Sequence, residues 1–162
     1  MKKAVIVLLG TLFLSSCSSK GNIYLPRPQD TNLKLWITQE VSENDLKELE
    51  LYEPGFGVDK FVDDNVYYEI SPYPDCSSNN SCVTSIEINS PSYYVYGITI
   101  ESDLSYVYNK LNENGFKFID NSNEQEYVSS VSYQNGNVNF SFTKNESIVL
   151  KATVTNNNNI IF

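Results

Sequence analysis

The sequence contains no histidine and only three cysteines among its 162 residues. The lack of histidine excludes every His-based catalytic triad and removes both the usual general base at neutral pH and the commonest metal ligand. Basic residues are scarce as well, at 11 against 20 acidic residues, so the formal net charge is −9. A chain this acidic is not expected to attract phosphate backbones or anionic lipid surfaces. We therefore expect no nucleic-acid partner, no metal and no cofactor.

Motifs of the common enzyme classes are also missing. The chain contains no G-x-S-x-G, no P-loop and no dinucleotide-binding glycine pattern. Carboxylates gather at Asp59, Asp63, Asp64 and Glu69, but without the alternating oxygen ligands and central glycine of a calcium loop. Because the small chain holds 20 acidic residues, chance pairs of carboxylates carry no catalytic signal. We expect a solvated acidic loop and no enzymatic activity.

The N-terminus has the parts of an export signal. Residues 1–3 carry two lysines, and residues 4–14 are mostly apolar. About eleven apolar residues are too few to cross a bilayer core of about 30 Å, but they fit the hydrophobic region of a signal peptide. The segment ends in Leu14-Ser15-Ser16-Cys17, which is an aliphatic residue, two small residues and a cysteine.

This ending resembles the lipobox of bacterial lipoproteins. The resemblance implies that residues 1–16 are a signal peptide and that Cys17 receives a diacylglyceryl group, with palmitate as a typical acyl chain. The alternative is an ordinary secretory signal with a chance cysteine. Residues 17–32 would then be a lipidated tether, and the mature chain would have nine basic and 20 acidic residues, because Lys2 and Lys3 are lost. Ser18 after the cysteine implies, in a Gram-negative host, an outer-membrane lipoprotein that faces the periplasm.

The two remaining cysteines, Cys76 and Cys82, flank a loop of five residues. In an exported protein such an even pair favours a disulfide bond. A zinc site would need two further ligands, and neither histidine nor another cysteine is present to supply them. A redox pair of the C-x-x-C type would have two intervening residues. The sequence therefore predicts a structural disulfide.

The chain shows signs of an internal duplication. Four short matches recur in the same order: residues 35–38 with 97–100, 55–56 with 115–116, 65–70 with 137–142, and 84–88 with 150–154. They predict an α+β protein of two tandem units, residues 33–91 and 92–155, each a helix packed on an antiparallel β-meander. Residues 156–162 would be an asparagine-rich tail.

Helix signals are present in both units. A first helix is expected from Ser42 until Pro54-Gly55 stops it. A second helix should begin at Ser102 as N-cap and end at Gly115. Its apolar face is Leu104, Val107, Tyr108 and Leu111. Most of the rest alternates as strands, and Asn135-Gly136 is a strong hairpin signal.

The order of these elements and the two Gly-Phe pairs, Gly55-Phe56 and Gly115-Phe116, resemble two groups of proteins. One is the β-lactamase inhibitor proteins, with two tandem helix-plus-sheet units. The other is the small outer-membrane assembly lipoproteins of the SmpA/OmlA type, with one such unit behind a lipobox. The resemblance implies protein binding rather than catalysis.

Tyrosine is abundant, with 12 copies. Tyr93, Tyr94 and Tyr96 precede the second unit, and Tyr73 and Asp75 lie beside the cysteine loop. These residues are the candidate binding surface, because tyrosine combines a large rigid contact area with a polar tip. The alternative is plain strand packing. The function expected is that of a membrane-anchored cell-envelope lipoprotein that binds another protein without catalysis. The alternative function is binding of cell-wall glycan or peptide.

Overall fold

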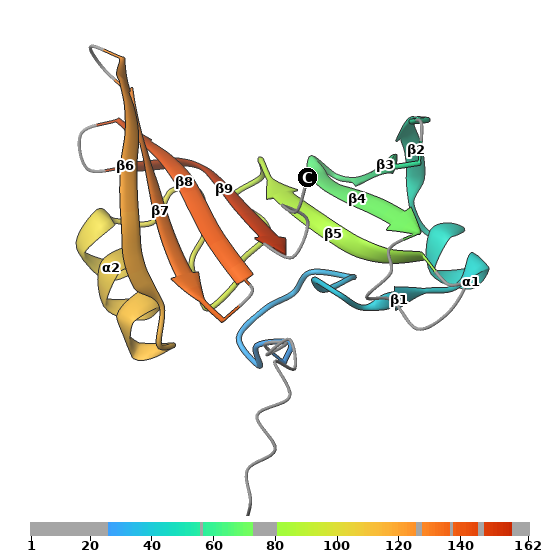
Figure 1. Cartoon of the computed structure of the whole chain (residues 1–162), viewed down its shortest axis with the longest axis horizontal. Coiled ribbons are helices and arrows are strands. Elements are labelled where there is room, and N and C mark those ends of the chain that lie inside the picture. The colour runs from blue at the N-terminus through green and yellow to red at the C-terminus, as the bar shows by residue number, and fades with distance from the viewer. Residues whose placement is uncertain are drawn as a thin grey trace, which may run out of the picture.

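Antiparallel strands make up most of the structure (Figure 1). The computed structural model describes residues 26–55, 57–72, 81–125, 128–136, 138–145 and 148–156. Within these ranges the strands are β1 (Glu40–Val41), β2 (Glu50–Glu53), β3 (Asp59–Asp63), β4 (Val66–Pro72), β5 (Ser81–Ile88), β6 (Lys117–Gln125), β7 (Val128–Asn135), β8 (Val138–Asn145) and β9 (Ile148–Asn156). The helices are α1 (Glu43–Leu46) and α2 (Leu104–Glu113), of four and ten residues.

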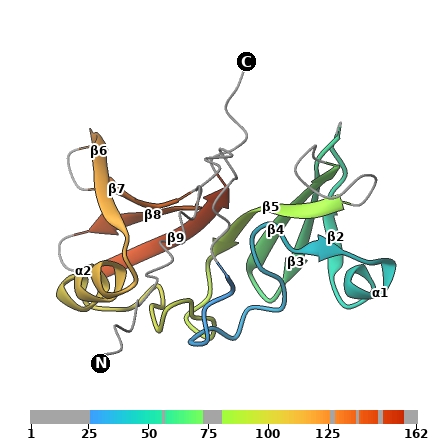
Figure 2. The same cartoon turned by 60° about the horizontal axis from the view of Figure 1, so that its bottom comes forward.

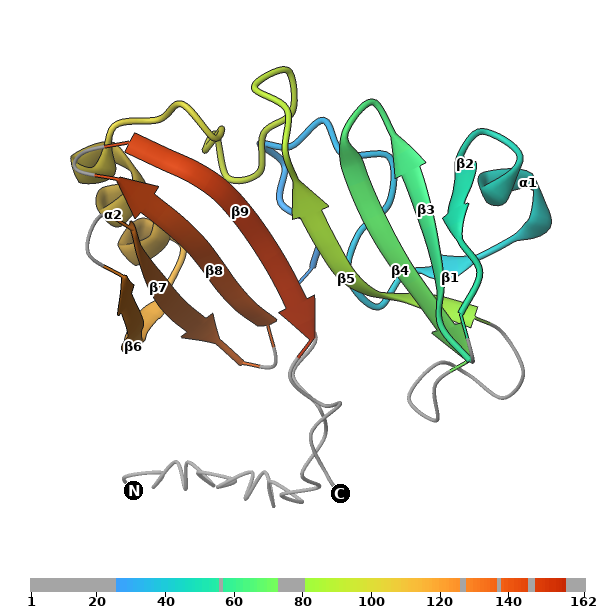
Figure 3. The ribbon, with the colours of Figure 1, turned by 90° about the horizontal axis from the view of Figure 1, so that it is seen from above.

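All of these strands join one antiparallel sheet. Its order is β2-β3-β4-β5-β9-β8-β7-β6, and β1 pairs with β5 outside this row. Strands β2 to β5 form one meander, here called the first half, and β6 to β9 form another, the second half. The two halves meet through β5 and β9, with Ser85 opposite Thr155 and Ile88 opposite Ala152. Figure 3 shows this row from above.

The expected fold class, α+β with two tandem helix-plus-sheet units, is wrong, because the protein is mostly β and its described residues form only two short helices. The α1 helix is about one turn long and has no buried residue, so it does not cover the first half of the sheet. The prediction failed at residues 48–51, Glu-Leu-Glu-Leu, whose alternation has the period of a strand. This stretch leads into β2, which pairs with β3. The start of α1 is confirmed, because Ser42 is its N-cap and forms a capping box with Asp45.

A segment without regular secondary structure, residues 33–37, covers most of the first half of the sheet. Four of the five residues from 33 to 37 are buried: Leu33, Leu35, Trp36 and Ile37. They share one core cluster with alternate residues of β4 and β5, namely Val66, Tyr68, Ile70, Ile86 and Ile88. Alternate residues of a strand point to the same side, so these side chains define the core face of the sheet. Each fully buried side chain of this size contributes about 1.5–3 kcal/mol relative to an exposed one.

The second half of the sheet is covered by α2. Val107 and Leu111 are its buried residues, and the ring of Tyr108 lies 6.1 Å from that of Tyr133 in β7. The helix begins one residue later than expected, because Asp103 is the N-cap and accepts a hydrogen bond from the Ser105 N–H at 2.8 Å. Its predicted end at Gly115 is confirmed by the positive φ of that residue, 77°, which favours glycine.

The two faces of the sheet differ in cover. Figure 2 shows α1, α2 and the blue segment that precedes β1 on one side of the sheet. No helix or connecting segment of the described residues lies across the other side, which we call the open face (Figure 2). Residues that alternate with the buried ones, such as Tyr67 and Glu69 in β4, are only partly buried. The open face is therefore the surface on which this fold presents side chains from most of its strands.

Candidate functional site

The predicted anchor and most of the predicted loop lie outside the described residues. This applies to Cys17, Tyr73, Asp75 and Cys76, so lipidation, the disulfide and the loop surface stay predictions. Cys82 is described, and it is buried at the beginning of β5, opposite Ser71 of β4. Pro72 pairs with Ser81, so the β4–β5 pairing holds the two ends of the loop side by side.

The three tyrosines before the second half do not gather on one surface. Tyr96 is 6% exposed, and its ring makes edge contacts with Trp36 at 6.1 Å and Phe116 at 5.3 Å between centroids. For Tyr96 the geometry therefore favours packing over a contact surface. Tyr94 is exposed, at 37%, and its backbone is fixed by Asn32, whose side chain accepts a hydrogen bond from the Tyr94 N–H at 2.8 Å.

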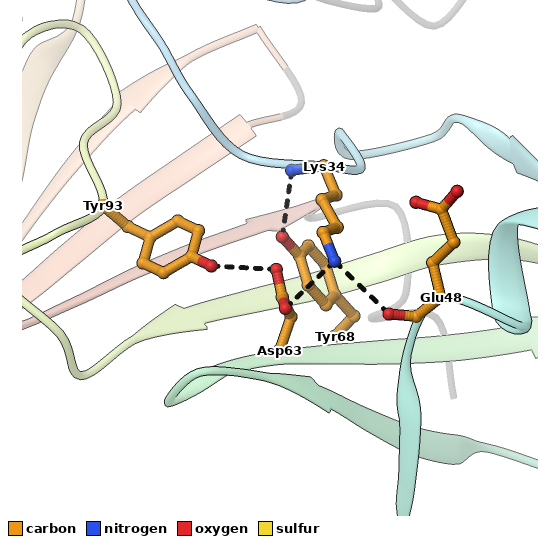
Figure 4. A network of polar contacts seen from close by, with 5 residues as sticks. All are labelled: Lys34, Glu48, Asp63, Tyr68 and Tyr93. Atoms are coloured by element: carbon orange, nitrogen blue, oxygen red, sulfur yellow. Dashed lines mark hydrogen bonds and ion pairs between the residues drawn. The ribbon is translucent and has the colours of Figure 1, made fainter.

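Tyr93 belongs to a polar network on the core side of the first half (Figure 4). Its hydroxyl donates a hydrogen bond to Asp63 Oδ2 at 2.9 Å, and Lys34 Nζ forms an ion pair with Asp63 Oδ1 at 3.0 Å. Lys34 Nζ also donates to the backbone oxygen of Glu48 at 3.3 Å, and the Lys34 N–H donates to the Tyr68 hydroxyl at 3.2 Å. The network thus links three parts of the chain: residues 33–37, the end of β3 and the loop before α2.

The surroundings of this network perturb two tyrosines. Desolvation, followed by the hydrogen bond to Asp63 and its negative charge, raises the pKa of Tyr93 to about 12. Burial raises the pKa of Tyr68 to about 12 as well, against the opposing hydrogen bond from the Lys34 backbone. Both hydroxyls therefore stay neutral over the physiological range. This is a structural role, since neither hydroxyl is available as a base or a nucleophile at neutral pH.

A different pair of tyrosines meets on the open face. The rings of Tyr52 in β2 and Tyr67 in β4 make an edge contact, with centroids 5.0 Å apart and planes at 74°. Lys60 Nζ in β3 lies 5.2 Å from the centroid of the Tyr67 ring, which is within cation–π range. Tyr52 is 58% exposed. The pair thus offers an aromatic surface that a partner can reach.

Acidic residues surround this aromatic pair. Residues directly opposite each other in an antiparallel pair share a face. The register of the sheet places Glu50 opposite Val62, Glu53 and Glu69 opposite Lys60, and Glu87 opposite Tyr67. We call this surface the acidic–aromatic face: Glu50, Tyr52, Glu53, Lys60, Tyr67, Glu69 and Glu87. Four glutamates against one lysine give it a negative charge.

The open face of the second half has another chemistry. The described side chains of β7 and β8 on this face are uncharged and partly buried: Ser130, Ser132, Gln134, Asn139, Ser141 and Thr143. At its edge the exposed Lys117 of β6 lies opposite Gln134 and adds a positive charge. The hydroxyls of Ser132 and Ser141 form a cross-strand hydrogen bond of 2.9 Å. Asn139 Oδ1 is buried and has no hydrogen-bond partner in the described part of the chain. Among its described side chains, this surface has neither the tyrosine rings nor the glutamates of the acidic–aromatic face.

The signal for the acidic–aromatic face was present in the sequence. Lys60 and Val62 in β3, like Tyr67 and Glu69 in β4, alternate with the core residues of their strands. The helix expected from Ser42 to Pro54-Gly55 includes Tyr52, so it gives no reason to place Tyr52 beside Tyr67 on a sheet. The correct strand assignment places both rings on one face.

The carboxylates expected to form an acidic loop are separated in the fold. Asp63 joins the network with Lys34 and Tyr93, whereas Asp59 accepts a hydrogen bond from the Gly55 N–H at 3.2 Å. Glu69 lies on the open face. Across the described ranges, no group of three or more acidic residues or cysteines is placed to hold a metal ion.

In the described ranges, neither helix has the length and apolar character needed to span a bilayer.

Comparison with known proteins adds no identification. No protein-family model, no curated protein and no solved structure matches the chain. The resemblance of the N-terminus to a lipobox, and the looser resemblance of the remaining chain to helix-plus-sheet binding proteins, therefore stay predictions from the sequence.

Proposed function

We propose that this chain is a lipid-anchored cell-envelope protein that binds another protein through its acidic–aromatic face and performs no catalysis. The anchor is Cys17, as the lipobox motif predicts. The partner presents lysine or arginine side chains to the face. The observation that supports this function most directly is the placement of two contacting tyrosines among four glutamates, on a side of the sheet that no other described segment covers.

Tyrosine is enriched among the residues that dominate binding energy at protein interfaces, because its rigid ring buries a large area at a low entropy cost. The contact between Tyr52 and Tyr67 fixes both rings further before any partner arrives. Lys60 already lies over the Tyr67 ring, so the face accommodates a cation in this structure. Basic side chains of a partner would add charge complementarity, which raises the rate of association and selects against acidic partners.

The anchor restricts where such a partner is found. From Cys17 to Pro26, where the described chain begins, there are nine residues, and a fully extended chain of this length spans at most about 32 Å. Acylation at Cys17 with two or three chains would hold the protein stably at the membrane surface. The partner is therefore a membrane protein or a protein close to the membrane.

The proposal is tested on the full-length lipoprotein. Partners are crosslinked in cells and identified by mass spectrometry, and the purified partner is then titrated with wild type and with Tyr67→Ala. We expect Tyr67→Ala to weaken binding by about 1–3 kcal/mol, as a hot-spot residue does. Wild-type binding should also weaken as salt is added, because charged contacts are screened.

Two further variants make this test specific. The double variant Ser132→Ala/Ser141→Ala changes the open face of the second half and should bind as wild type does. Cys17→Ser should lose labelled palmitate that the wild type incorporates. The proposal fails if Tyr67→Ala binds the identified partner with unchanged affinity, or if Cys17→Ser is labelled equally.

A further inference from the structure

A polar pocket lies away from the acidic–aromatic face, between the described N-terminal segment and α2. Its volume is about 460 Å³, within the range of small-molecule sites. Its polar side chains come from Gln29, Asp30, Tyr96, Lys110, Glu113 and Asn114. Residues far apart in the sequence thus meet in one concave site.

Tyr96 is the most buried residue of this pocket, at 6% exposure. Its backbone has a φ of 55°, and its ring is held by edge contacts with Trp36 and Phe116, so its position is well defined. Burial alone raises the pKa of Tyr96 to about 12, which keeps the hydroxyl protonated at neutral pH. No residue of the described chain forms a hydrogen bond with this hydroxyl. In the described chain Asn139 Oδ1 is the fully buried side-chain polar atom that lacks a partner, so the Tyr96 hydroxyl, although its residue is largely buried, is open to the pocket and available to a ligand.

Charged groups of both signs line the same pocket as Tyr96. Lys110 Nζ forms an ion pair with Glu113 Oε2 at 3.2 Å. Asp30 contributes to raising the pKa of Lys110 through its negative charge, although Glu113 is the main cause. Gly97 permits this arrangement, since a Cβ there would lie 2.5 Å from Asp30 Oδ2, and its φ of 70° also favours glycine.

The donors and acceptors of the pocket indicate the kind of ligand. Carboxylates accept hydrogen bonds only, an ammonium group donates only, and a hydroxyl does both. An anionic ligand would meet Asp30 and Glu113, and a cationic ligand would meet Lys110. A neutral molecule with several adjacent hydroxyls can donate to both carboxylates and accept from Lys110 and Tyr96 without like-charge repulsion.

We propose that this pocket binds a single neutral sugar residue, with the Tyr96 hydroxyl, Asp30 and Lys110 as its polar contacts. This is a second binding activity that does not depend on the acidic–aromatic face. It also fits the alternative function predicted from the sequence, binding of cell-wall glycan.

The test uses the full-length chain and neutral methyl glycosides of glucose, galactose and N-acetylglucosamine as probes. Saturation-transfer NMR identifies which glycoside binds, and calorimetry gives its dissociation constant. We expect Tyr96→Phe to raise that constant about tenfold while the melting temperature stays equal or rises, because only an unpartnered hydroxyl is removed. Asp30→Asn should weaken binding in the same direction. L-lysine and inorganic phosphate, as charged probes, should not bind.

Tyr93→Phe is the matched control. It removes a tyrosine hydroxyl that is bonded to Asp63 outside the pocket, so it should lower stability and leave glycoside binding unchanged. The proposal is overturned if no glycoside binds, if Tyr96→Phe binds the glycoside as wild type does, or if lysine or phosphate binds in a Tyr96-dependent manner. Tyr67→Ala should leave glycoside binding unchanged. Failure of the sugar proposal can therefore be told apart from failure of the proposed protein binding by the acidic–aromatic face.

Discussion

The two halves of the sheet bury the same kind of surface in different ways. In the second half α2 supplies the cover, with Val107 and Leu111 fully buried. In the first half residues 33–37 supply most of it, and α1 has no fully buried residue, although Leu46 packs against the core. Both solutions place apolar side chains against alternate residues of a four-stranded meander. The comparison shows that such a meander needs an apolar cover of the right area, whether or not that cover is a helix.

The open faces of the two halves differ as well. The first carries the acidic–aromatic face, whereas the described side chains of β7 and β8 on the second are uncharged and Lys117 at its edge is basic. The core faces of both halves are packed against other parts of the protein, so a partner can reach only the open faces. The difference in chemistry between the two open faces is therefore the difference that matters for binding. This difference predicts that substitutions on the open face of the first half weaken binding of the partner protein, whereas substitutions on the open face of the second half do not.

The largest effect expected from this comparison is a difference between leucines of the two helices. Leu111 in α2 is fully buried, so Leu111→Ala should cost about 2–5 kcal/mol of unfolding free energy. Leu46 in α1 is only partly buried, so Leu46→Ala should cost roughly 1 kcal/mol. Urea unfolding followed by circular dichroism measures both.

Leu104 tests whether the cost of a Leu→Ala substitution depends on burial or on which helix contains the leucine. It lies in α2 but is only partly buried, so Leu104→Ala should resemble Leu46→Ala more than Leu111→Ala. Equal losses at Leu46 and Leu111 would show that α1 covers the first half as α2 covers the second, and the contrast between the halves would be wrong.

Much of the second half could be predicted from the sequence. Val138, Phe140 and Phe142 alternate with polar residues, and all three are buried in β8. The hairpin expected at Asn135-Gly136 is present, but Asn135 pairs with Val138, so the turn lies one residue further along. These signals are local, and local signals of strand period and turn chemistry are read directly from sequence.

The first half was harder to predict because a helical N-terminus precedes a strand-like alternation. Ser42 and Asp45 form a true capping box, but the helix ends at Leu46, and residues 48–51 already alternate toward β2. The joining of the halves through β5 and β9 is a contact between distant segments, for which the sequence has no local signal.

For the candidate site, the sequence predicted the type of residue, tyrosine, but not which tyrosines form it. The abundance of tyrosine indicated an interface, but the side on which each ring lies depends on the register of the sheet. Tyr96 is buried because its left-handed backbone, with φ at 55°, directs the chain into the core between Trp36 and Phe116. Such a conformation is uncommon for a residue other than glycine and has no signature in the sequence.

High pH should destabilise the first half through Tyr68. The pKa of Tyr68 is raised to about 12 by burial, whereas in the unfolded chain it is about 10. The unfolded state therefore loses its proton first, and stability that is fully present below pH 10 falls as the pH rises toward 12. The loss at Tyr68 should be on the order of 2–3 kcal/mol. Urea unfolding at several pH values, with tyrosinate absorbance, measures it.

Tyr68→Phe sharpens this test. The variant lacks the titrating hydroxyl, so its stability should fall less steeply between pH 10 and 12, although it also loses the hydrogen bond from the Lys34 N–H at neutral pH. Identical alkaline slopes for the variant and the wild type would contradict the assignment to Tyr68.

The smallest effects concern the ion pair of each half. Asp63 is 16% exposed, pairs with Lys34 and accepts the Tyr93 hydroxyl, so Asp63→Ala should cost about 1–2 kcal/mol, because it leaves that hydroxyl without its acceptor. In the second half Glu113 pairs with Lys110 on the exposed side of α2, and Glu113→Gln should leave the unfolding free energy unchanged within error. A double-mutant cycle of Asp63→Ala with Tyr93→Phe should show coupling, since the two residues share one hydrogen bond. Additive losses in that cycle would mean that the network only accompanies the packing of the first half and does not stabilise it.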